Sequence, residues 1–414
     1  MKKLMILGAG IYQVPLIRQA REMGLYTIAV SCPGDYPGFE VADQVCLLDT
    51  RDREGILEAA KREGIDGVCT SGTDVAVAAI GYICKRLGLC GLSFDAACRV
   101  TDKWRMKEAF CRGGVSTPRF EKASSLVQVR QAAQRLGYPL VVKAVDSSGS
   151  RGVVIVKEES QLEAAFHEAM EVSQKGYVLA EEYIQAHEIG VDGFVKGGRL
   201  VFFAPHEKYM FRSGQAAAPA GHRFPYLGSQ RLLEEIRRQM QLAVDAVGLD
   251  ACPVNADVLV DGERAWVLEI GGRTGATCIP ELISIHYGFS FYEKIIENAL
   301  GNPVDFPESA ESVYKPCEGR LLMSPVDGVI SRIEEEGLVS LKEAGAQIVM
   351  DYPVGHKVEA MRNGTSRIGH VIAQTEMEEE FQAIYDQAQS CVWVNGETLL
   401  YLNGCAGRGG RMDG

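Results

Sequence analysis

The pattern of hydrophobic and polar residues predicts strands and helices in alternation along the first part of the chain. Apolar runs at residues 4–7, 26–30, 44–48 and 67–72 are typical of short buried strands, and helical periodicity covers residues 11–23, 53–63 and a stretch after Asp74. Strands that alternate with helices favour a parallel sheet covered by helices on both faces.

Two loops at the ends of these strands are candidate ligand sites. Gly8 and Gly10 resemble the start of a dinucleotide-binding turn, but Gln13 replaces the third glycine and no acid ends the second strand, so NAD is not expected. The segment Ser71-Gly72-Thr73-Asp74 ends another strand, where open α/β sheets bind ligands. An equal alternative is that Thr73 or Asp74 caps the next helix.

An apolar strand at residues 140–145 contains a single lysine, Lys143. A buried ammonium group requires an anionic partner. The loop Ser147-Ser148-Gly149-Ser150-Arg151-Gly152 follows, and then the strand 153–156. A hairpin with such a loop can cover phosphates with backbone N–H groups, and the alternative is an ordinary hairpin turn.

The stretch from Val254 to Thr277 predicts two strands joined by a turn at Asp261-Gly262. Asp257 and Glu269 lie within these apolar strands, where a carboxylate is costly without a cation. Paired strands would bring the two acids together, and Mg²⁺ prefers such oxygen ligands. The alternative is a hairpin whose acids face water.

Three further segments complete the prediction. A strand at residues 177–180 runs into Glu181 and Glu182, and Glu188 begins the next strand, an arrangement that could hold a planar base and a ribose diol. Residues 212–225 are rich in small residues and are predicted to form an irregular loop that could close over a site. Residues 311–414 predict several antiparallel strands, a helix at 377–390 and a disordered tail from 404.

Charge and cysteine usage narrow the class of protein. A net charge of -12 and a pI near 5.2 argue against nucleic acid or an anionic membrane as a partner, although an anionic ligand can still bind where basic groups converge. The twelve cysteines have no zinc-like spacing, and neither a signal peptide nor a membrane span is evident, which predicts a cytoplasmic protein with reduced thiols.

Four motifs occur in a characteristic order: Lys103, Lys143 followed by SSGSRG, EEYIQAHE, and Asp257 with Glu269 and Arg273. This set resembles the ATP-grasp superfamily of carboxylate–amine ligases, in particular its phosphoribosylglycinamide-synthetase-like and L-amino-acid-ligase-like members. The resemblance implies an α/β and α+β protein with three domains. These are a Rossmann-like pre-ATP-grasp domain at 1–95, an ATP-grasp domain at 96–310 with a flap at about 118–185, and a mainly antiparallel domain at 311–414.

The resemblance also implies roles for individual residues. Lys103 and Lys143 would contact ATP phosphates under the flap residues Ser148, Gly149, Ser150 and Gly152. The adenosine would lie against Glu181, Glu182, Tyr183, Ile184 and Glu188, and Asp257 and Glu269 would hold one or two Mg²⁺ ions, for which Mn²⁺ is the alternative. Arg273 would meet the acyl phosphate or the substrate carboxylate, and it is counted with Lys143 as catalytic.

One position departs from the family pattern. Many relatives have Asn two residues after the second metal-binding Glu, where this chain has Gly271, and Asn255 is a candidate replacement. The expected activity is ATP- and Mg²⁺-dependent joining of a small carboxylate to an amine by a homodimer. The alternatives are a ligase acting on a phosphoribosyl amine and a non-catalytic nucleotide-binding protein. The sequence does not identify the two substrates.

Overall fold

The computed structural model describes the whole chain except residues 148, 150, 214–215, 308–313, 363 and 407–414. The chain forms two compact units: the first comprises 1–204, 227–276 and 292–306, and the second comprises 205–226, 277–291 and 307–414. The three domain ranges expected from the sequence stay predictions.

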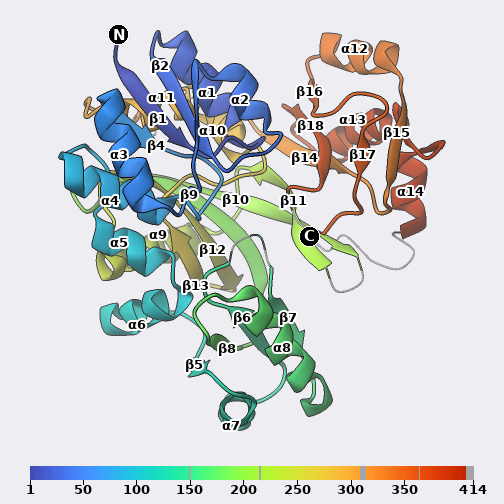
Figure 1. The fold of residues 1–414 in the computed structure, drawn as a ribbon. Coiled ribbons are helices and arrows are strands. Elements are labelled where there is room, and N and C mark those ends of the chain that lie inside the picture. Colours follow the sequence, from blue (N-terminus) through green and yellow to red (C-terminus); the bar gives the residue numbers. More distant parts are fainter. Residues whose placement is uncertain (148, 150, 214–215, 308–313, 363, 407–414) are drawn as a thin grey trace. The chain divides into compact units, whose positions relative to one another are not determined.

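The first unit begins with a parallel sheet in the order β3-β2-β1-β4, as the alternating pattern predicted. Its strands are β1 (Lys3–Leu7), β2 (Tyr26–Ser31), β3 (Gln44–Leu47) and β4 (Gly67–Cys69). Helices α1 (Val14–Glu22) and α2 (Pro37–Val41) pack together, as do α3 (Arg53–Glu63) and α4 (Val77–Leu87), and the two pairs lie on opposite sides of the sheet (Figure 1). Helices α5 (Phe94–Val100) and α6 (Lys103–Gly113) follow.

A second sheet of the first unit carries the predicted flap hairpin. Its order is β5-β8-β6-β7, and all its pairs are antiparallel. The strands are β5 (Phe120–Ala123), β6 (Leu140–Ala144), β7 (Val153–Val156) and β8 (Val178–Glu182). Helices α7 (Leu126–Leu136) and α8 (Leu162–Val172) pack on this sheet over a core that includes Val129, Leu140 and Phe166, and a 3₁₀ turn at Glu159–Gln161 precedes α8.

The third sheet of this unit holds the central hairpin. Strand β12 (Cys252–Asp261) pairs with β13 (Arg264–Gly271) on one side and with β9 (His187–Lys196) on the other. Helix α9 (Gln230–Val247) packs against β13 and α6, and Ser229 caps it by accepting a hydrogen bond from the Leu232 N–H. Helix α11 (Phe291–Ala299) completes the unit.

The second unit is mainly antiparallel in its sheets, as predicted. Five neighbouring strands of an eight-stranded sheet run in the order β10-β11-β14-β18-β16, and a separate sheet has the order β17-β15-β19-β20. The elements are β10 (Arg199–Ser213, which starts in the first unit), β11 (Ala216–Phe224), α10 (Ile279–Tyr287), β14 (Cys317–Met323), β15 (Gly328–Ile333), α12 (Glu335–Glu343), β16 (Gln347–Met350), β17 (Lys357–Val358), β18 (Arg367–Ala373), α13 (Glu378–Ser390), β19 (Val392–Val394), β20 (Glu397–Thr398) and α14 (Leu399–Ala406). Leu322, Phe381 and Tyr385 contribute to its core.

The irregular loop predicted at residues 212–225 is wrong. Apart from 214–215, which lie outside the described residues, the segment forms strand β11, paired with β10 and β14. Its small residues permit this pairing: a Cβ on Gly221 would lie 2.5 Å from the backbone oxygen of Gly319 in β14. The small residues of this segment allow close packing of strands and are not a signal of irregular structure.

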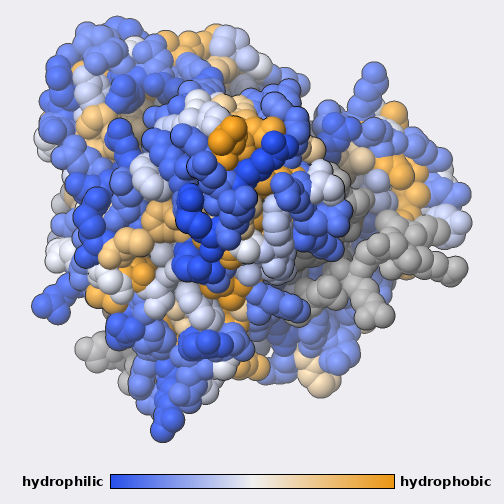
Figure 2. Space-filling model, turned by 90° about the horizontal axis from the view of Figure 1, so that it is seen from below, coloured by the Kyte–Doolittle hydropathy of each residue, from blue (hydrophilic) through white to orange (hydrophobic). Residues whose placement is uncertain are grey.

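The predicted tail requires a similar correction. Residues 404–406 belong to helix α14, and 407–414 lie outside the described residues. The eleven cysteines from Cys32 to Cys391 are free, in agreement with the prediction of reduced thiols. Hydrophilic residues cover most of the face shown in Figure 2, where hydrophobic ones form separate patches. Among the described helices, none is long and apolar enough to cross a membrane.

Candidate functional site

The β12–β13 hairpin places Asp257 directly opposite Glu269, as the sequence predicted. Asn255, two residues earlier, lies opposite Gly271. Because side chains alternate along a strand, Asn255 and Asp257 share one face of β12, although a bulge follows Asp257. Glu269 is about one-third exposed. The two acids are therefore cross-strand neighbours.

Lys103, at the start of α6, binds one of these acids. Its Nζ lies 2.9 Å from Oε2 of Glu269 and donates a hydrogen bond of 3.0 Å to the backbone oxygen of Ser147. Burial alone would lower the pKa of Lys103, but Glu269, and then Asp74 and Asp257, raise it above its usual value. A cation thus already lies where these carboxylates converge.

The start of α6 is fixed by Asp102, which accepts hydrogen bonds from the Trp104 and Arg105 N–H groups. The preceding residue, Thr101, is the C-cap of α5. The hydroxyl of Tyr177 donates to the other oxygen of Asp102 at 2.9 Å. Asp102, a buried cap residue that also binds Tyr177, therefore fixes the start of the helix that carries Lys103.

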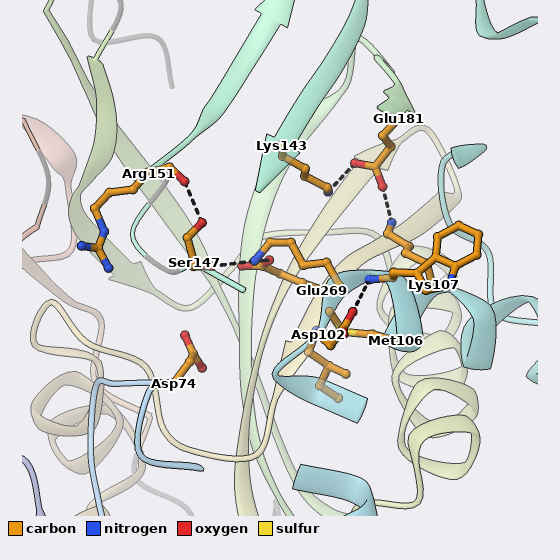
Figure 3. A network of polar contacts seen from close by, with 12 residues as sticks. Asp74, Asp102, Met106, Lys107, Lys143, Ser147, Arg151, Glu181 and Glu269 are labelled. Atoms are coloured by element: carbon orange, nitrogen blue, oxygen red, sulfur yellow. Dashed lines mark hydrogen bonds and ion pairs between the residues drawn. The ribbon is translucent and has the colours of Figure 1, made fainter. Parts of the chain in front are cut away.

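Lys143 lies in β6, and its Nζ is 2.5 Å from Oε2 of Glu181 in β8. The other oxygen of Glu181 is 2.5 Å from Nζ of Lys107, so the carboxylate lies between two lysines (Figure 3). Burial alone would raise the pKa of Glu181, but Lys107 and Lys143 lower it. Burial is also the main reason that the pKa of Lys107 falls to about 8. Glu181 is therefore the anionic partner that the embedded Lys143 was expected to have.

Arg273 is held by two groups. Its Nη2 donates to Oδ2 of Asp74 at 2.8 Å, and its Nη1 donates to Oδ1 of Asn255 at 2.6 Å. The Asn255 amide donates in turn to Asp192 at 2.7 Å. Asp192 is fully buried and also accepts hydrogen bonds from the Thr274 hydroxyl and the Gly275 N–H. A buried carboxylate thus anchors the loop that carries the arginine.

A cavity of about 370 Å³ opens between these elements of the first unit. Its described lining has five cationic side chains against three carboxylates: Arg51, Lys103, Arg151, Lys175 and Arg273 against Asp74, Asp146 and Glu269. Basic groups therefore converge locally in a chain whose net charge is -12, as an anionic ligand requires. Lys143, Glu181 and Asp257 are not part of that described lining.

The flap and the adenosine segment remain predictions as binding elements. Ser148 and Ser150 lie outside the described residues, and Gly149 and Gly152 both have positive φ angles, 67° and 66°. Glu182 forms an ion pair with Arg119, with 3.0 Å between Oε2 and Nε. The segment Tyr183–Ala186 links β8 to β9, where Glu188 lies opposite Leu259 of β12.

The two candidate loops of the first sheet differ in the space and the groups available to a ligand. The side chain of Gln13 fills the glycine turn: its Oε1 accepts from the Gly10 N–H at 2.9 Å, and a Cβ on Gly8 would lie 2.9 Å from it. Asp74 does not cap α4, whose N-cap residue is Ala76 without a side-chain hydrogen bond. Its carboxylate lines the cavity instead, which favours the ligand-site alternative for this loop.

The acid pair has the donor chemistry of a magnesium site. Asp257 and Glu269 supply hard oxygen atoms beside a lysine ammonium, the kind of charge that a divalent cation could replace. No group of three or more His, Cys, Asp or Glu residues that could hold a metal occurs in the described ranges. An ion bound here would therefore keep positions for water and phosphate, as Mg²⁺ usually does.

Sequence reasoning missed Lys107 and Asp192. Lys107 is four residues after Lys103 on a helix, so the two share one face, and this spacing was the available signal. Asp192 lies at the centre of an apolar strand, the same signal that identified Asp257. Neither signal names the partner, because Lys107–Glu181 and Asp192–Asn255 join segments that are distant in sequence.

Comparison with known proteins agrees with this geometry. Residues 136–281 match the model of an ATP-grasp domain, and residues 320–396 match that of L-amino acid ligase C-terminal domain 2. Alanine–anticapsin ligase of Bacillus amyloliquefaciens is 25% identical over 359 residues, with 75% of each chain covered.

Two solved structures share the fold. L-amino acid ligase from Bacillus licheniformis superposes with a TM-score of 0.82 at 20% identity and covers 96% of this chain and 99% of its own. Phosphoribosylglycinamide synthetase from Anaerococcus prevotii has a TM-score of 0.76 at 27% identity and covers 95% and 99%.

Proposed function

Because the chain belongs to the ATP-grasp superfamily and is an ADP-forming carboxylate–amine ligase, we propose that it joins two small molecules of the amino-acid class. The observation that carries the proposal is the basic cavity in which Lys103, Glu269 and Arg273 lie together. ATP would transfer a phosphoryl group to the carboxylate substrate and so form an acyl phosphate. The amine substrate would then displace phosphate and form an amide.

The residues divide this work between binding and positioning. Lys103 and Lys143 would neutralise phosphate charge, and Arg273 would bind the carboxylate of the substrate or its acyl phosphate. Asp257 and Glu269 would hold Mg²⁺, which supplies charge neutralisation at the transferring phosphoryl group. The protein contributes positions and electrostatics, and no side-chain nucleophile is needed.

The segment from Glu181 to Glu188 would bind adenosine. Glu181 would accept from the adenine amino group, and Glu182, Tyr183 and Ile184 would line the base. Both oxygens of Glu181 contact lysines in the structure. Binding of adenine would therefore require one of these oxygens to give up its contact with a lysine. Glu188 would bind the ribose hydroxyls. The flap residues Ser148, Gly149, Ser150 and Gly152 would close over the phosphates.

A second candidate is a ligase acting on a phosphoribosyl amine. The similarity to phosphoribosylglycinamide synthetase favours it. A phosphoribosyl group would need basic residues from the first sheet and its helices. Of the basic residues in this part of the chain, Arg51 lines the described part of the cavity, whereas Lys2, Lys3, Arg18 and Arg21 do not.

One assay separates the two candidates: release of ADP and phosphate measured against a panel of amino-acid pairs and phosphoribosyl amines. Release that depends on amino acids supports the first proposal, and release that depends on phosphoribosyl amines supports the second. ATP binding without release under any pairing would contradict both. Lys143→Ala and Glu269→Ala should abolish release, and full turnover in either variant would contradict the site assignment.

We also propose that the protein acts as a cytoplasmic homodimer and that Mn²⁺ can replace Mg²⁺. The resemblance to the family supports these expectations. Sedimentation of the full chain would test the oligomeric state, and a metal titration of ADP release would test the substitution. A monomer at assay concentration, or no release with Mn²⁺, would contradict the respective expectation.

A further inference from the structure

Gly271 leaves a vacant side-chain position beside the proposed metal site. It is two residues after Glu269, where many ATP-grasp proteins have an asparagine, and it lies at the end of β13 opposite Asn255. Asn255 does not fill the role, since its Oδ1 accepts from Arg273 and its Nδ2 donates to Asp192. The role of the asparagine oxygen is therefore open to another group of this chain.

Asp74 occupies the space that a residue 271 side chain would need. A Cβ added to Gly271 would lie 3.0 Å from Oδ1 of Asp74, closer than side-chain carbons normally approach an oxygen. An asparagine at 271 would therefore require Asp74 to move by a few tenths of an ångström from its present position. The loop after β4 thus places the carboxylate of Asp74 where relatives have the amide of the asparagine.

The two oxygens of Asp74 have different surroundings. Oδ2 accepts from Nη2 of Arg273 at 2.8 Å, whereas Oδ1 faces Gly271 and accepts no hydrogen bond from the residues that the structure describes. Asp74 also lines the cavity together with Glu269 (Figure 3). One oxygen therefore holds the arginine, and the other is directed at the vacant position.

Two electrostatic relationships agree with a cation near Asp74. Glu269 and Asp74 line the same cavity, and each already pairs with a cation there, Glu269 with Lys103 at 2.9 Å and Asp74 with Arg273 at 2.8 Å. Asp74 adds one negative charge beside Gly271, and one of its oxygens pairs with the Arg273 guanidinium.

We propose that Asp74 takes over the role of the missing asparagine indirectly, by accepting a hydrogen bond from a water bound to the ion. A water link is required because no three-acid group close enough for direct ligation exists in the described ranges. Oxygen partners of this kind commonly change metal affinity by about 10- to 100-fold when removed. The inference depends on the proposed function, since it concerns the same metal.

The test is a swap of the two side chains, with Mn²⁺ as the probe and its affinity for the ADP complex of the full chain measured by electron paramagnetic resonance. Asp74→Ala should weaken Mn²⁺ binding about 10-fold or more. Asp74→Ala combined with Gly271→Asn should restore it, because the vacated space admits the amide. Gly271→Asn alone should not tighten binding, because its Cβ meets Asp74.

The control is Asp43→Ala, which removes another acid–arginine pair of the first unit, Asp43 with Arg21, outside the described cavity lining. Its Mn²⁺ affinity should equal that of the wild type, and thermal unfolding should show that every variant is folded. Unchanged affinity in Asp74→Ala would overturn the inference. So would a double variant that binds no more tightly than Asp74→Ala, since Asp74 would then act only through Arg273. Failure of the wild type to bind Mn²⁺ with ADP would instead overturn the proposed function.

Discussion

Lys107 and Glu181 form an ion pair whose two side chains are almost completely buried, with 2.5 Å between Nζ and Oε1. Lys107 also donates to the Thr117 hydroxyl, which donates in turn to the backbone oxygen of Val267 in β13. This chain of contacts connects α6, the sheet that carries the flap, and the central hairpin. The pair therefore fixes the relative positions of three elements of the proposed ATP site.

Lys107→Met should destabilise the protein because it removes one partner of a buried pair. Loss of such a partner typically costs about 3–5 kcal/mol, and we expect a value near 3 because Glu181 keeps Lys143. Urea unfolding measures the difference. The matched control is Lys61→Met, which breaks the surface pair with Glu58 and should cost little. Equal effects of the two changes would contradict the structural role of Lys107.

The pKa of Lys107 predicts how its contribution to stability changes with pH. The folded value of about 8 is below the ordinary 10.5, so between these two values the unfolded chain binds more protons than the folded one. Stability attributable to this residue should therefore rise with pH, by at most about 1.4 kcal/mol per pH unit. The difference in unfolding free energy between wild type and Lys107→Met, measured from pH 7.5 to 9.5 in steps, should change in favour of the wild type. A constant difference would be the contrary result.

Asp192→Ala should impair catalysis through Arg273 without removing a group that touches substrate. Asn255, Thr274 and Gly275 would lose their shared acceptor, and the arginine would lose its fixed position. Misplacement of a binding group by about 1 Å can cost about 100-fold in rate. We expect a loss of that size in kcat/KM for whichever substrate pair supports turnover, with ADP affinity unchanged.

Asp192→Asn serves as the conservative variant for this prediction. Its amide keeps one acceptor oxygen and nearly the same shape, so a large part of the activity should return. If Asp192→Asn were as inactive as Asp192→Ala while ADP affinity also fell, Asp192 would be part of the general structure of the site, and its specific action on Arg273 would be contradicted.

Gly221→Ala should destabilise the second unit. The new Cβ would lie 2.5 Å from the backbone oxygen of Gly319, which cannot move without shifting β14. Overpacking of this kind typically costs about 1–3 kcal/mol. Gly404→Ala is the control, because a Cβ there meets nothing within 4 Å and alanine favours a helix by about 1 kcal/mol over glycine. Calorimetry of the full chain should show a lower midpoint for the first variant only.

The sequence alone determined the elements that depend on local pattern. The alternation of strands and helices specified the parallel sheet β3-β2-β1-β4, and the Asp261-Gly262 turn between apolar runs specified the β12–β13 hairpin that carries Asp257 and Glu269. The register set by the turn alone would pair Asp257 with Leu268, and the bulge after Asp257 moves this residue opposite Glu269, so the exact cross-strand pair was decided in the folded hairpin. The embedded Lys143 likewise indicated a buried anion, although it did not identify Glu181.

Tertiary structure decided which distant groups meet. Lys107 finds Glu181, Arg273 finds Asp74, and Asp74 fills the space beside Gly271, all across long separations in the chain. Packing also decided the secondary structure of residues 216–224, because two neighbouring strands impose β-structure on a segment with a low intrinsic preference for strands. Local sequence states what a buried charge or a small residue requires, but only the folded chain brings the group that satisfies it.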